Sequence, residues 1–152
     1  MSTKKTKLLA ISSPGGHWTQ LNRLCDGLAE RYDIVYAVPD KLFKPPTGQT
    51  VYSIMDVSAD DKWRLLPCAA QVLWILLRER PQAVLSTGAA PGVVAIILGS
   101  LLKKRTIWVD SIANVKQISR SGEMIKKRAD VFLTQWEHLS DPQTILYKGA
   151  VL

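Results

Sequence analysis

Two glycine-rich segments each follow a short apolar run and precede a helical pattern. Residues 12–17 read Ser-Ser-Pro-Gly-Gly-His, and residues 86–92 read Ser-Thr-Gly-Ala-Ala-Pro-Gly. Glycines let a backbone approach a ligand closely, and exposed amides at the start of a helix favour an anion. Close packing of a helix against a sheet also requires small residues, so both interpretations stay open. The substrate-binding candidates in these segments are Ser13, Gly15, Gly16, Thr87 and Gly88.

Two side chains are candidates for a general base. His17 opens the helical pattern after the first glycine-rich segment, and Asp110 ends the apolar run 106–109. Histidine exchanges a proton near neutral pH, and a carboxylate can bind a sugar hydroxyl or remove its proton. His17 can equally donate to a phosphate or cap the turn, and Asp110 can cap a helix. The sequence does not choose between them as the base.

Further polar and aromatic groups follow the later apolar runs. Ser111 comes directly after Asp110, while Gln135 and Trp136 follow the run 131–134. The carboxyl ends of parallel strands meet at one edge of a sheet, where ligands bind. We therefore add Ser111, Gln135 and Trp136 to the substrate-binding candidates. Trp136 suits either stacking on a sugar or contact with a partner.

The segment 63–80 has a composition that suits a membrane interface. It is a largely apolar helical pattern with tryptophans and flanking basic residues. Tryptophan and arginine are typical of the boundary between lipid and water. A core helix of the domain is the alternative. The predicted membrane contacts are Trp63, Trp74, Arg78 and Arg80.

The chain is basic, with 20 Lys and Arg against 13 Asp and Glu and a formal net charge of +7. Two clusters, residues 103–105 and 126–128, carry much of this excess and suit anionic lipid headgroups. No aromatic residues alternate with these clusters as in a nucleic-acid module, so nucleic acid is not an expected partner. With two Cys, two His and no CxxC, no metal site is expected.

The elements that position these residues alternate as strand, turn and helix. Apolar runs predict strands at 7–12, 33–38, 50–54, 83–86, 105–110, 131–135 and 143–147. Apolar periodicity predicts helices from Trp18, from about Leu66 to Glu79, over 93–102 and over 121–128, with a loop over 40–49. This alternation indicates an α/β fold, a Rossmann-like open parallel sheet with helices on both faces. Residues 1–152 are expected to form a single domain.

No apolar stretch of about 20 residues exists, so no segment is expected to span a bilayer. The N-terminal apolar run is too short for a secretory signal, which predicts a cytoplasmic protein. Any membrane contact would then be peripheral, at the inner face, through an amphipathic surface.

Taken in order, the motifs resemble one family. They are Ser13-x-Gly-Gly-His17, Ser86-Thr87-Gly88, Asp110-Ser111 and the run from Ala129 to Glu137. The set resembles the membrane-recruiting subunit of the eukaryotic UDP-GlcNAc transferase that adds the second GlcNAc to dolichol diphosphate. It is more similar still to bacterial capsule and exopolysaccharide subunits of that type.

The resemblance implies the N-terminal half of a GT-B glycosyltransferase. A separate donor-binding subunit would form a heterodimer with it, and the apolar C-terminal segment 144–152 is the predicted contact. Together they would transfer a sugar from a UDP donor to a lipid-linked oligosaccharide acceptor carrying a diphosphate. No metal or cofactor is expected, and the chain alone is expected to be inactive.

The sequence departs from the family pattern in three places. It lacks the N-terminal membrane helix of the eukaryotic relatives, it has Asp110 where bacterial relatives have Glu, and it has Asn114 where they commonly have Arg. Two other functions remain as alternatives. One is a non-catalytic membrane adaptor that activates a catalytic partner, and the other is a stand-alone nucleotide-binding enzyme.

Overall fold

The computed structural model describes residues 4–39, 48–58 and 60–151, so most of the loop expected at 40–49 lies outside the described residues. The described part forms a seven-stranded sheet in the order β3-β2-β1-β4-β5-β6-β7, and every neighbouring pair is parallel. The strands are β1 (Thr6–Ile11), β2 (Tyr32–Val38), β3 (Thr50–Ser53), β4 (Ala83–Ser86), β5 (Arg105–Val109), β6 (Val131–Thr134) and β7 (Leu146–Tyr147). The predicted parallel α/β sheet is confirmed.

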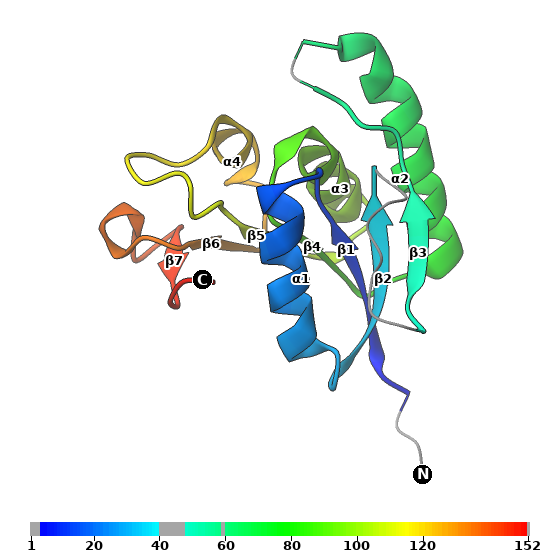
Figure 1. The fold of residues 1–152 in the computed structure, drawn as a ribbon, viewed down its shortest axis with the longest axis horizontal. Coiled ribbons are helices and arrows are strands. Elements are labelled where there is room, and N and C mark those ends of the chain that lie inside the picture. Colours follow the sequence, from blue (N-terminus) through cyan, green and yellow to red (C-terminus); the bar gives the residue numbers. More distant parts are fainter. Residues whose placement is uncertain (1–3, 40–47, 59, 152) are drawn as a thin grey trace.

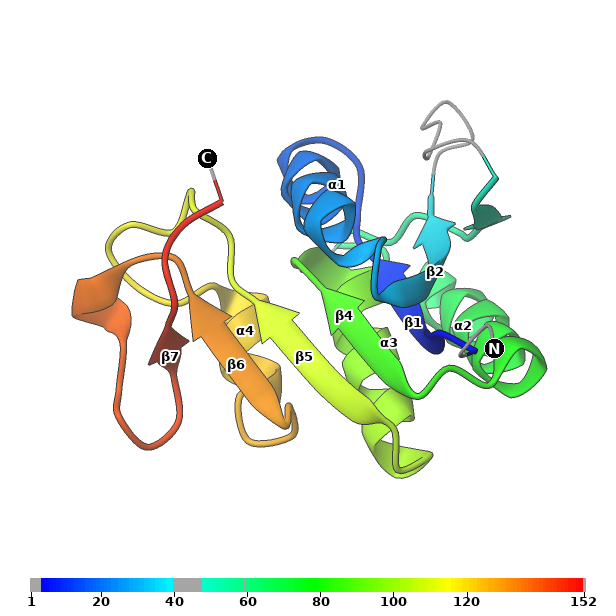
Figure 2. The same ribbon diagram turned by 90° about the horizontal axis from the view of Figure 1, so that it is seen from below.

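Helices cover both faces of this sheet (Figure 2). On one face lies α1 (Gly16–Leu28), and on the other lie α2 (Leu65–Glu79), α3 (Ala89–Leu101) and α4 (Arg120–Ile125). Short 3-10 turns, Lys62–Arg64 and Glu137–Leu139, precede α2 and follow β6. Among the described residues, no helix combines the length and the apolar character needed to cross a membrane.

Alternation along the strands divides the core into two layers. In β1, Leu9 and Ile11 pack with α2 and α3, whereas Leu8 and Ala10 pack with α1. Successive side chains of a strand point to opposite faces, so a strand buried on both faces must be apolar throughout. This explains why β1, β2 and β4 read as continuous apolar runs.

The helices differ in how they are buried. Helix α1 buries one stripe, which includes Trp18, Leu21 and Cys25. Helix α3 is apolar nearly all round because the sheet covers one side and α2 and α4 cover others. The free thiols of Cys25 and Cys68 are both fully buried, and burial raises the pKa of Cys68 to about 11. They act as small apolar side chains.

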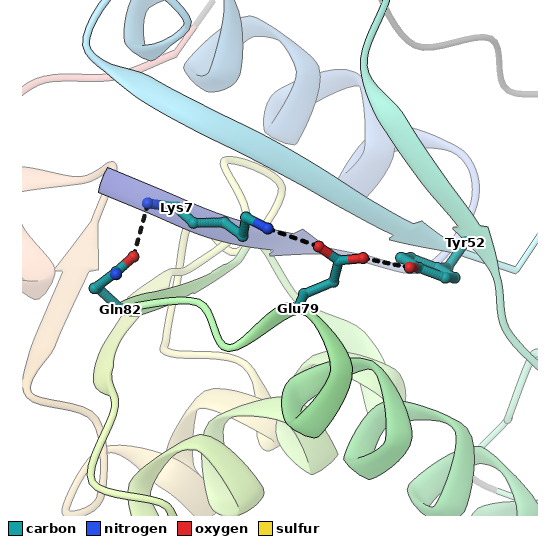
Figure 3. Close-up of polar contacts among 4 residues, drawn as sticks. All are labelled: Lys7, Tyr52, Glu79 and Gln82. Atoms are coloured by element: carbon teal, nitrogen blue, oxygen red, sulfur yellow. Dashed lines mark hydrogen bonds and ion pairs between the residues drawn. The ribbon is translucent and has the colours of Figure 1, made fainter. Parts of the chain in front are cut away.

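A polar cluster ties the C-terminal end of α2 to two strands (Figure 3). Glu79 accepts from the Lys7 ammonium of β1 at 2.8 Å and from the hydroxyl of Tyr52 in β3. The side chains of Lys7 and Glu79 are 29% and 14% exposed, so solvent screens this pair less than a surface ion pair. The amide of Lys7 also donates to Gln82 at 2.8 Å. This cluster fixes the direction of α2 along the edge of the sheet.

We expect Glu79→Gln to lower the free energy of unfolding at neutral pH by about 1 kcal/mol. Hydrogen bonds from Lys7 and then Tyr52 lower the pKa of Glu79, and the bond to Glu79 raises the pKa of Lys7. The stabilisation should therefore be present between the unfolded-state pKa values, about 4.3 for Glu and 10.4 for Lys. It should be lost as the pH falls through the folded pKa of Glu79 or rises through that of Lys7.

Urea unfolding between pH 3 and pH 10 measures this difference. Glu123→Gln is the control, because the Glu123 carboxylate pairs with Lys126 on the surface and is 50% exposed. Equal losses in the two variants, or a loss for Glu79→Gln that does not shrink as the pH falls towards 3, would contradict the assignment.

Candidate functional site

The turns after β1 and β4 meet at the point where the strand order reverses. From β1 the chain winds outward to β2 and β3, and it then returns to place β4 on the other side of β1. In open parallel sheets such a reversal leaves a crevice at the carboxyl edge. A cleft of about 630 Å³ opens there. It is lined by Ser13, Pro14, His17, Asp56, Val57, Ser58, Ala89, Ala90, Ser111, Ala113, Asn114, Ser119, Arg120 and Ser121.

Reciprocal hydrogen bonds join these two turns. The His17 ring nitrogen Nδ1 lies 3.0 Å from the Thr87 carbonyl oxygen, and the Thr87 hydroxyl donates to the His17 carbonyl at 2.6 Å. A carbonyl oxygen can only accept, so this bond requires the proton on Nδ1, and in the neutral ring Nε2 then keeps its lone pair. His17 therefore offers an acceptor nitrogen on a side chain that lines the cleft.

Glycine is required at position 88 by both conformation and space. Its φ is +145°, and a Cβ there would lie 2.5 Å from two atoms of the His17 ring. Thr87 and Gly88 are buried beneath the cleft, and the turn continues into Ala89 and Ala90, which line it. The predicted Thr87 and Gly88 thus lie behind the histidine, while Gly15 and Gly16 are exposed beside it with open space around them.

Asp110 lies beneath the cleft with its carboxylate fully engaged. It is 2% exposed and accepts from the Trp108 indole at 3.0 Å, from the Asn114 amide at 3.3 Å, and from Ser119. Ser119 donates twice, through its hydroxyl at 2.5 Å and its backbone amide at 2.9 Å. A carboxylate occupied by four donors and shielded from solvent suits a structural role better than proton transfer.

Ser111 lines the cleft, whereas Gln135 is buried below it. The Gln135 amide nitrogen donates to the Gln20 side-chain oxygen at 2.6 Å and to the Asp110 carbonyl at 3.0 Å. Its oxygen accepts from the Val151 amide at 2.7 Å, and Gln20 donates to the Ser111 hydroxyl at 3.2 Å. Gln135 therefore joins α1, the turn after β5 and the C-terminal segment.

Trp136 also lies outside the residues that line the cleft. Its indole nitrogen donates to the carbonyl of Ile112 at 2.8 Å, and its ring lies 6.0 Å from that of His138. The indole thus supports the loop after β5. The structure brings Ser13, His17 and Ser111 together, with Gly15, Gly16, Thr87 and Gly88 adjacent. It does not bring Gln135 and Trp136 to the cleft.

Sequence reasoning missed the lining residues in the loop after β3 and at the start of α4, and it found only Ser111 among those in the loop after β5. Asp56 and Ser58 follow a short strand at the edge of the sheet, and no local pattern marks them. Arg120 carried a usable signal. It follows Ser119, which caps α4 by accepting from the Gly122 amide at 2.9 Å, so Ser119 and the following turn predict a helix start.

The predicted membrane contacts lie on and beside α2, which runs along the edge of the sheet next to β3 (Figure 1). Trp63 is 92% exposed and Trp74 is 51% exposed. The Arg78 guanidinium lies 5.2 Å from the centre of the Trp74 ring, and Arg80 caps the C-terminal end of the helix. The exposed apolar side chains of this helix and of the 3-10 turn before it form an apolar stripe, which consists of Trp63, Leu66, Leu73, Trp74 and Leu77.

A second apolar surface lies on the other face of the sheet. Buried and half-buried side chains of α1, β4, β5 and β6 line an apolar groove of about 580 Å³ there, which includes Leu28, Ile107 and Leu133. A smaller groove beside residues 148–151 shares Leu24, Val109 and Leu133 with it. No group of three His, Cys, Asp or Glu side chains suited to a metal occurs among the residues described.

The strand order, the cleft at the reversal and the joined turns define a Rossmann-like domain of the kind that makes up one half of a GT-B glycosyltransferase. MurG of Acinetobacter baumannii has this fold: its TM-score is 0.78 at 10% identity, over 94% of this chain and 45% of MurG. UDP-N-acetylglucosamine 2-epimerase of Rickettsia bellii gives a TM-score of 0.73 at 15% identity, over 97% of this chain and 45% of that one.

The chain belongs to the family described as oligosaccharide biosynthesis protein Alg14 like, whose model matches residues 60–151. The UDP-N-acetylglucosamine transferase subunit ALG14 of Mus musculus is 27% identical, over 96% of this chain and 83% of that protein. The subunit of the same name from Cryptococcus neoformans (strain B-3501A) is 38% identical over 49% of this chain. This chain spans about a third, 35%, of that Cryptococcus protein.

Proposed function

We propose that this chain is the acceptor-binding subunit of a heteromeric glycosyltransferase, which moves a sugar from a UDP-sugar to a lipid-diphosphate-linked acceptor. The observation that carries the proposal is the reciprocal bonding of His17 and Thr87, which joins two glycine-rich turns at the cleft. The family and the names of the relatives, which are transferase subunits, support it. The bacterial capsule or exopolysaccharide setting belongs to the same proposal.

His17 is the base in this proposal. Its Nε2 accepts the proton of the acceptor hydroxyl as that oxygen attacks the anomeric carbon of the donor. The bond between the sugar and the UDP oxygen breaks, and UDP leaves with the electron pair. Asp110 acts as a positioning residue that shapes the loop after β5. Ser13 and Ser111 contact the acceptor from opposite sides of the switch point, and Gly15 and Gly16 leave room for it.

The donor-binding partner contacts the C-terminal segment and the apolar groove on the α1 face of the sheet. Leu146, Tyr147 and residues 148–150 are exposed, and the groove beside them is continuous with the apolar surface over β4 to β6. An apolar groove beside an exposed segment of chain suits a protein interface. Binding there brings the donor site of the partner against the cleft.

The stripe on α2 holds the chain at the inner face of the membrane. Tryptophans at the lipid boundary, with Arg78 and Arg80 toward headgroups, suit a helix that lies in the plane of the interface. The basic clusters at 103–105 and 126–128 lie at the amino ends of β5 and β6, at the sheet edge away from the cleft. There they add attraction to anionic lipid, and the acceptor reaches the cleft from the side of α2.

Co-expression with the product of the neighbouring open reading frame tests this function. We expect a stable heterodimer that transfers labelled sugar from a UDP-sugar to a lipid-diphosphate acceptor in vesicles, with background activity from either chain alone. Transfer by the isolated chain, or tight binding of a UDP-sugar to it in calorimetry, would instead support a stand-alone enzyme.

A further inference from the structure

One permanent positive charge lies among the described side chains that line the cleft. It belongs to Arg120, whose guanidinium has no hydrogen bond or ion pair with another described residue. The neighbouring lining groups Ser119, Ser121 and Asn114 are neutral and polar. Among the described residues that line the cleft, Asp56 is the only one with a carboxylate, and it comes from the loop after β3. An unpaired guanidinium among hydroxyl and amide groups suits an anionic oxygen ligand.

The backbone that carries Arg120 is held rigidly by Asp110. The two oxygens of this carboxylate bind the amide and hydroxyl of Ser119, the residue directly before Arg120. The side-chain amide of Asn114 and the backbone amide of Ser119 both donate to Oδ2 of Asp110. Positions 114 and 119 are therefore close together in space. The Asp110 carboxylate thus holds the loop 111–119 at residue 114 and at its last residue, Ser119.

The first turn of α4 packs directly on this carboxylate. A Cβ at Gly122 would lie 2.9 Å from Asp110 Oδ1, 2.9 Å from a methyl of Ile118 and 3.0 Å from the ring of Phe132. Ser119 also caps the turn that contains Arg120. The backbone at Arg120 is therefore held in place, and the exposed Arg120 side chain extends from a fixed point beside the cleft.

We propose that Arg120 binds a diphosphate in the cleft, held in position by Asp110, and that this diphosphate is the one on the lipid-linked acceptor. This inference rests on the proposed function, since a UDP-sugar also carries a diphosphate and is the alternative source. The guanidinium donates two parallel hydrogen bonds to two phosphate oxygens, a bidentate geometry that a lysine cannot reproduce. Arg120 is the residue that binds the diphosphate, and Asp110 is a positioning residue that holds Ser119, directly before Arg120, in place.

Steady-state kinetics of the heterodimer distinguish the two sources. Arg120→Ala should raise the KM for the acceptor about 10- to 100-fold and leave the KM for the UDP-sugar within about twofold. Arg120→Lys should recover only part of this loss. Lys116→Ala is the matched control, because Lys116 is an exposed cation on the same loop but does not line the cleft. An unchanged acceptor KM, equal effects in the control, or a rise confined to the donor KM would overturn the proposal.

A rescue variant tests whether the loss in Arg120→Ala comes from the missing guanidinium in the cleft or from misfolding. Because Asn114 also lines the cleft and shares an Asp110 oxygen with Ser119, Asn114→Arg in the Arg120→Ala background should restore at least about tenfold of the lost acceptor affinity. A loss caused only by misfolding would not be restored by this second change. Failure of the rescue, together with a lowered melting temperature for Arg120→Ala, would assign Arg120 a structural role.

Titration of the isolated chain separates this inference from the proposed function. Farnesyl diphosphate and inorganic pyrophosphate should bind weakly to the unmodified chain, and about tenfold more weakly or worse to Arg120→Ala, by ³¹P NMR. If the heterodimer transfers no sugar but this difference is found, the proposed function fails and the diphosphate site stands. If transfer occurs and neither probe distinguishes Arg120→Ala from Lys116→Ala, the diphosphate site is wrong.

Discussion

Replacing His17 by alanine in the reconstituted heterodimer should lower kcat for sugar transfer by about 10²- to 10⁴-fold, which is the usual contribution of a general base. The bond from Nδ1 to the Thr87 carbonyl leaves Nε2 as the acceptor nitrogen, so the variant loses the group that takes the hydroxyl proton. Heterodimer formation should be unaffected, because His17 lies in the cleft and away from the C-terminal segment. Initial rates at saturating donor and acceptor measure the effect.

A second substitution changes the position of His17 without removing it. Gly88→Ala places a methyl group 2.5 Å from the ring, which must then leave the Thr87 carbonyl, so a loss of kcat comparable to that of His17→Ala is expected. Gly27→Ala is the matched control, because no atom lies within 4 Å of a Cβ at that position. Full turnover by His17→Ala in an intact complex would favour the adaptor function, with the base on the partner.

The second large effect concerns the membrane. Trp63→Ser combined with Leu66→Ser should reduce partitioning onto vesicles of phosphatidylcholine and phosphatidylglycerol by about 100-fold. Full burial of each apolar side chain contributes roughly 1.5–3 kcal/mol. Trp63 is 92% and Leu66 is 79% exposed, so neither substitution should affect folding. Trp74 is a less suitable position for this test, because its ring packs edge-on against Tyr52 and its replacement would also disturb that contact.

Cosedimentation with vesicles measures this partitioning, and thermal unfolding monitors the fold of the variant. Met124→Ser is the control, because Met124 is 70% exposed but lies on α4 rather than α2. A loss of the same size for Met124→Ser would mean that general hydrophobicity drives binding. Unchanged binding of the double variant would exclude the stripe on α2 as the membrane contact.

The order of elements could be predicted from the sequence because a doubly buried strand and an amphipathic helix leave distinct patterns. Strand β4 occurs at the predicted residues 83–86, and α2 begins at Leu65, one residue before the expected start. Helix α3 begins at residue 89 rather than 93, because Pro91 is tolerated within a first helical turn. Helix α4 ends at residue 125 rather than 128, before the run of three basic residues.

The last strand shows where local patterns are insufficient. An apolar run predicted a strand over 143–147, but only Leu146 and Tyr147 pair with β6. Asp141 instead forms a bridge with Ile145 and turns the chain back on itself. Edge pairing depends on the neighbouring strand as much as on propensity, and β6 is itself short.

The candidate site was predictable in location but not in detail. Because the carboxyl ends of parallel strands meet, the sequence placed Ser13, His17 and Ser111 at one edge, and all three line the cleft. The burial of Asp110 depends on Ser119 and Asn114, which reach it only when the loop closes. The side chain of Gln135 is engaged in hydrogen bonds with Gln20 and with the amide of Val151, which lie 115 and 16 residues away in the sequence. Such distant contacts leave no periodic signal.

The order of the strands also has a consequence for how the chain folds. The central strands β1 and β4 are neighbours in the sheet, yet residue 8 pairs with residue 83, and the His17–Thr87 bond closes a loop of 70 residues. Contacts this distant in sequence are slow to form because the entropy of loop closure is lost before they stabilise the chain. During synthesis the first three strands therefore emerge before the centre of the sheet can close. The cleft is completed only afterwards, in the same late event that joins β1 to β4.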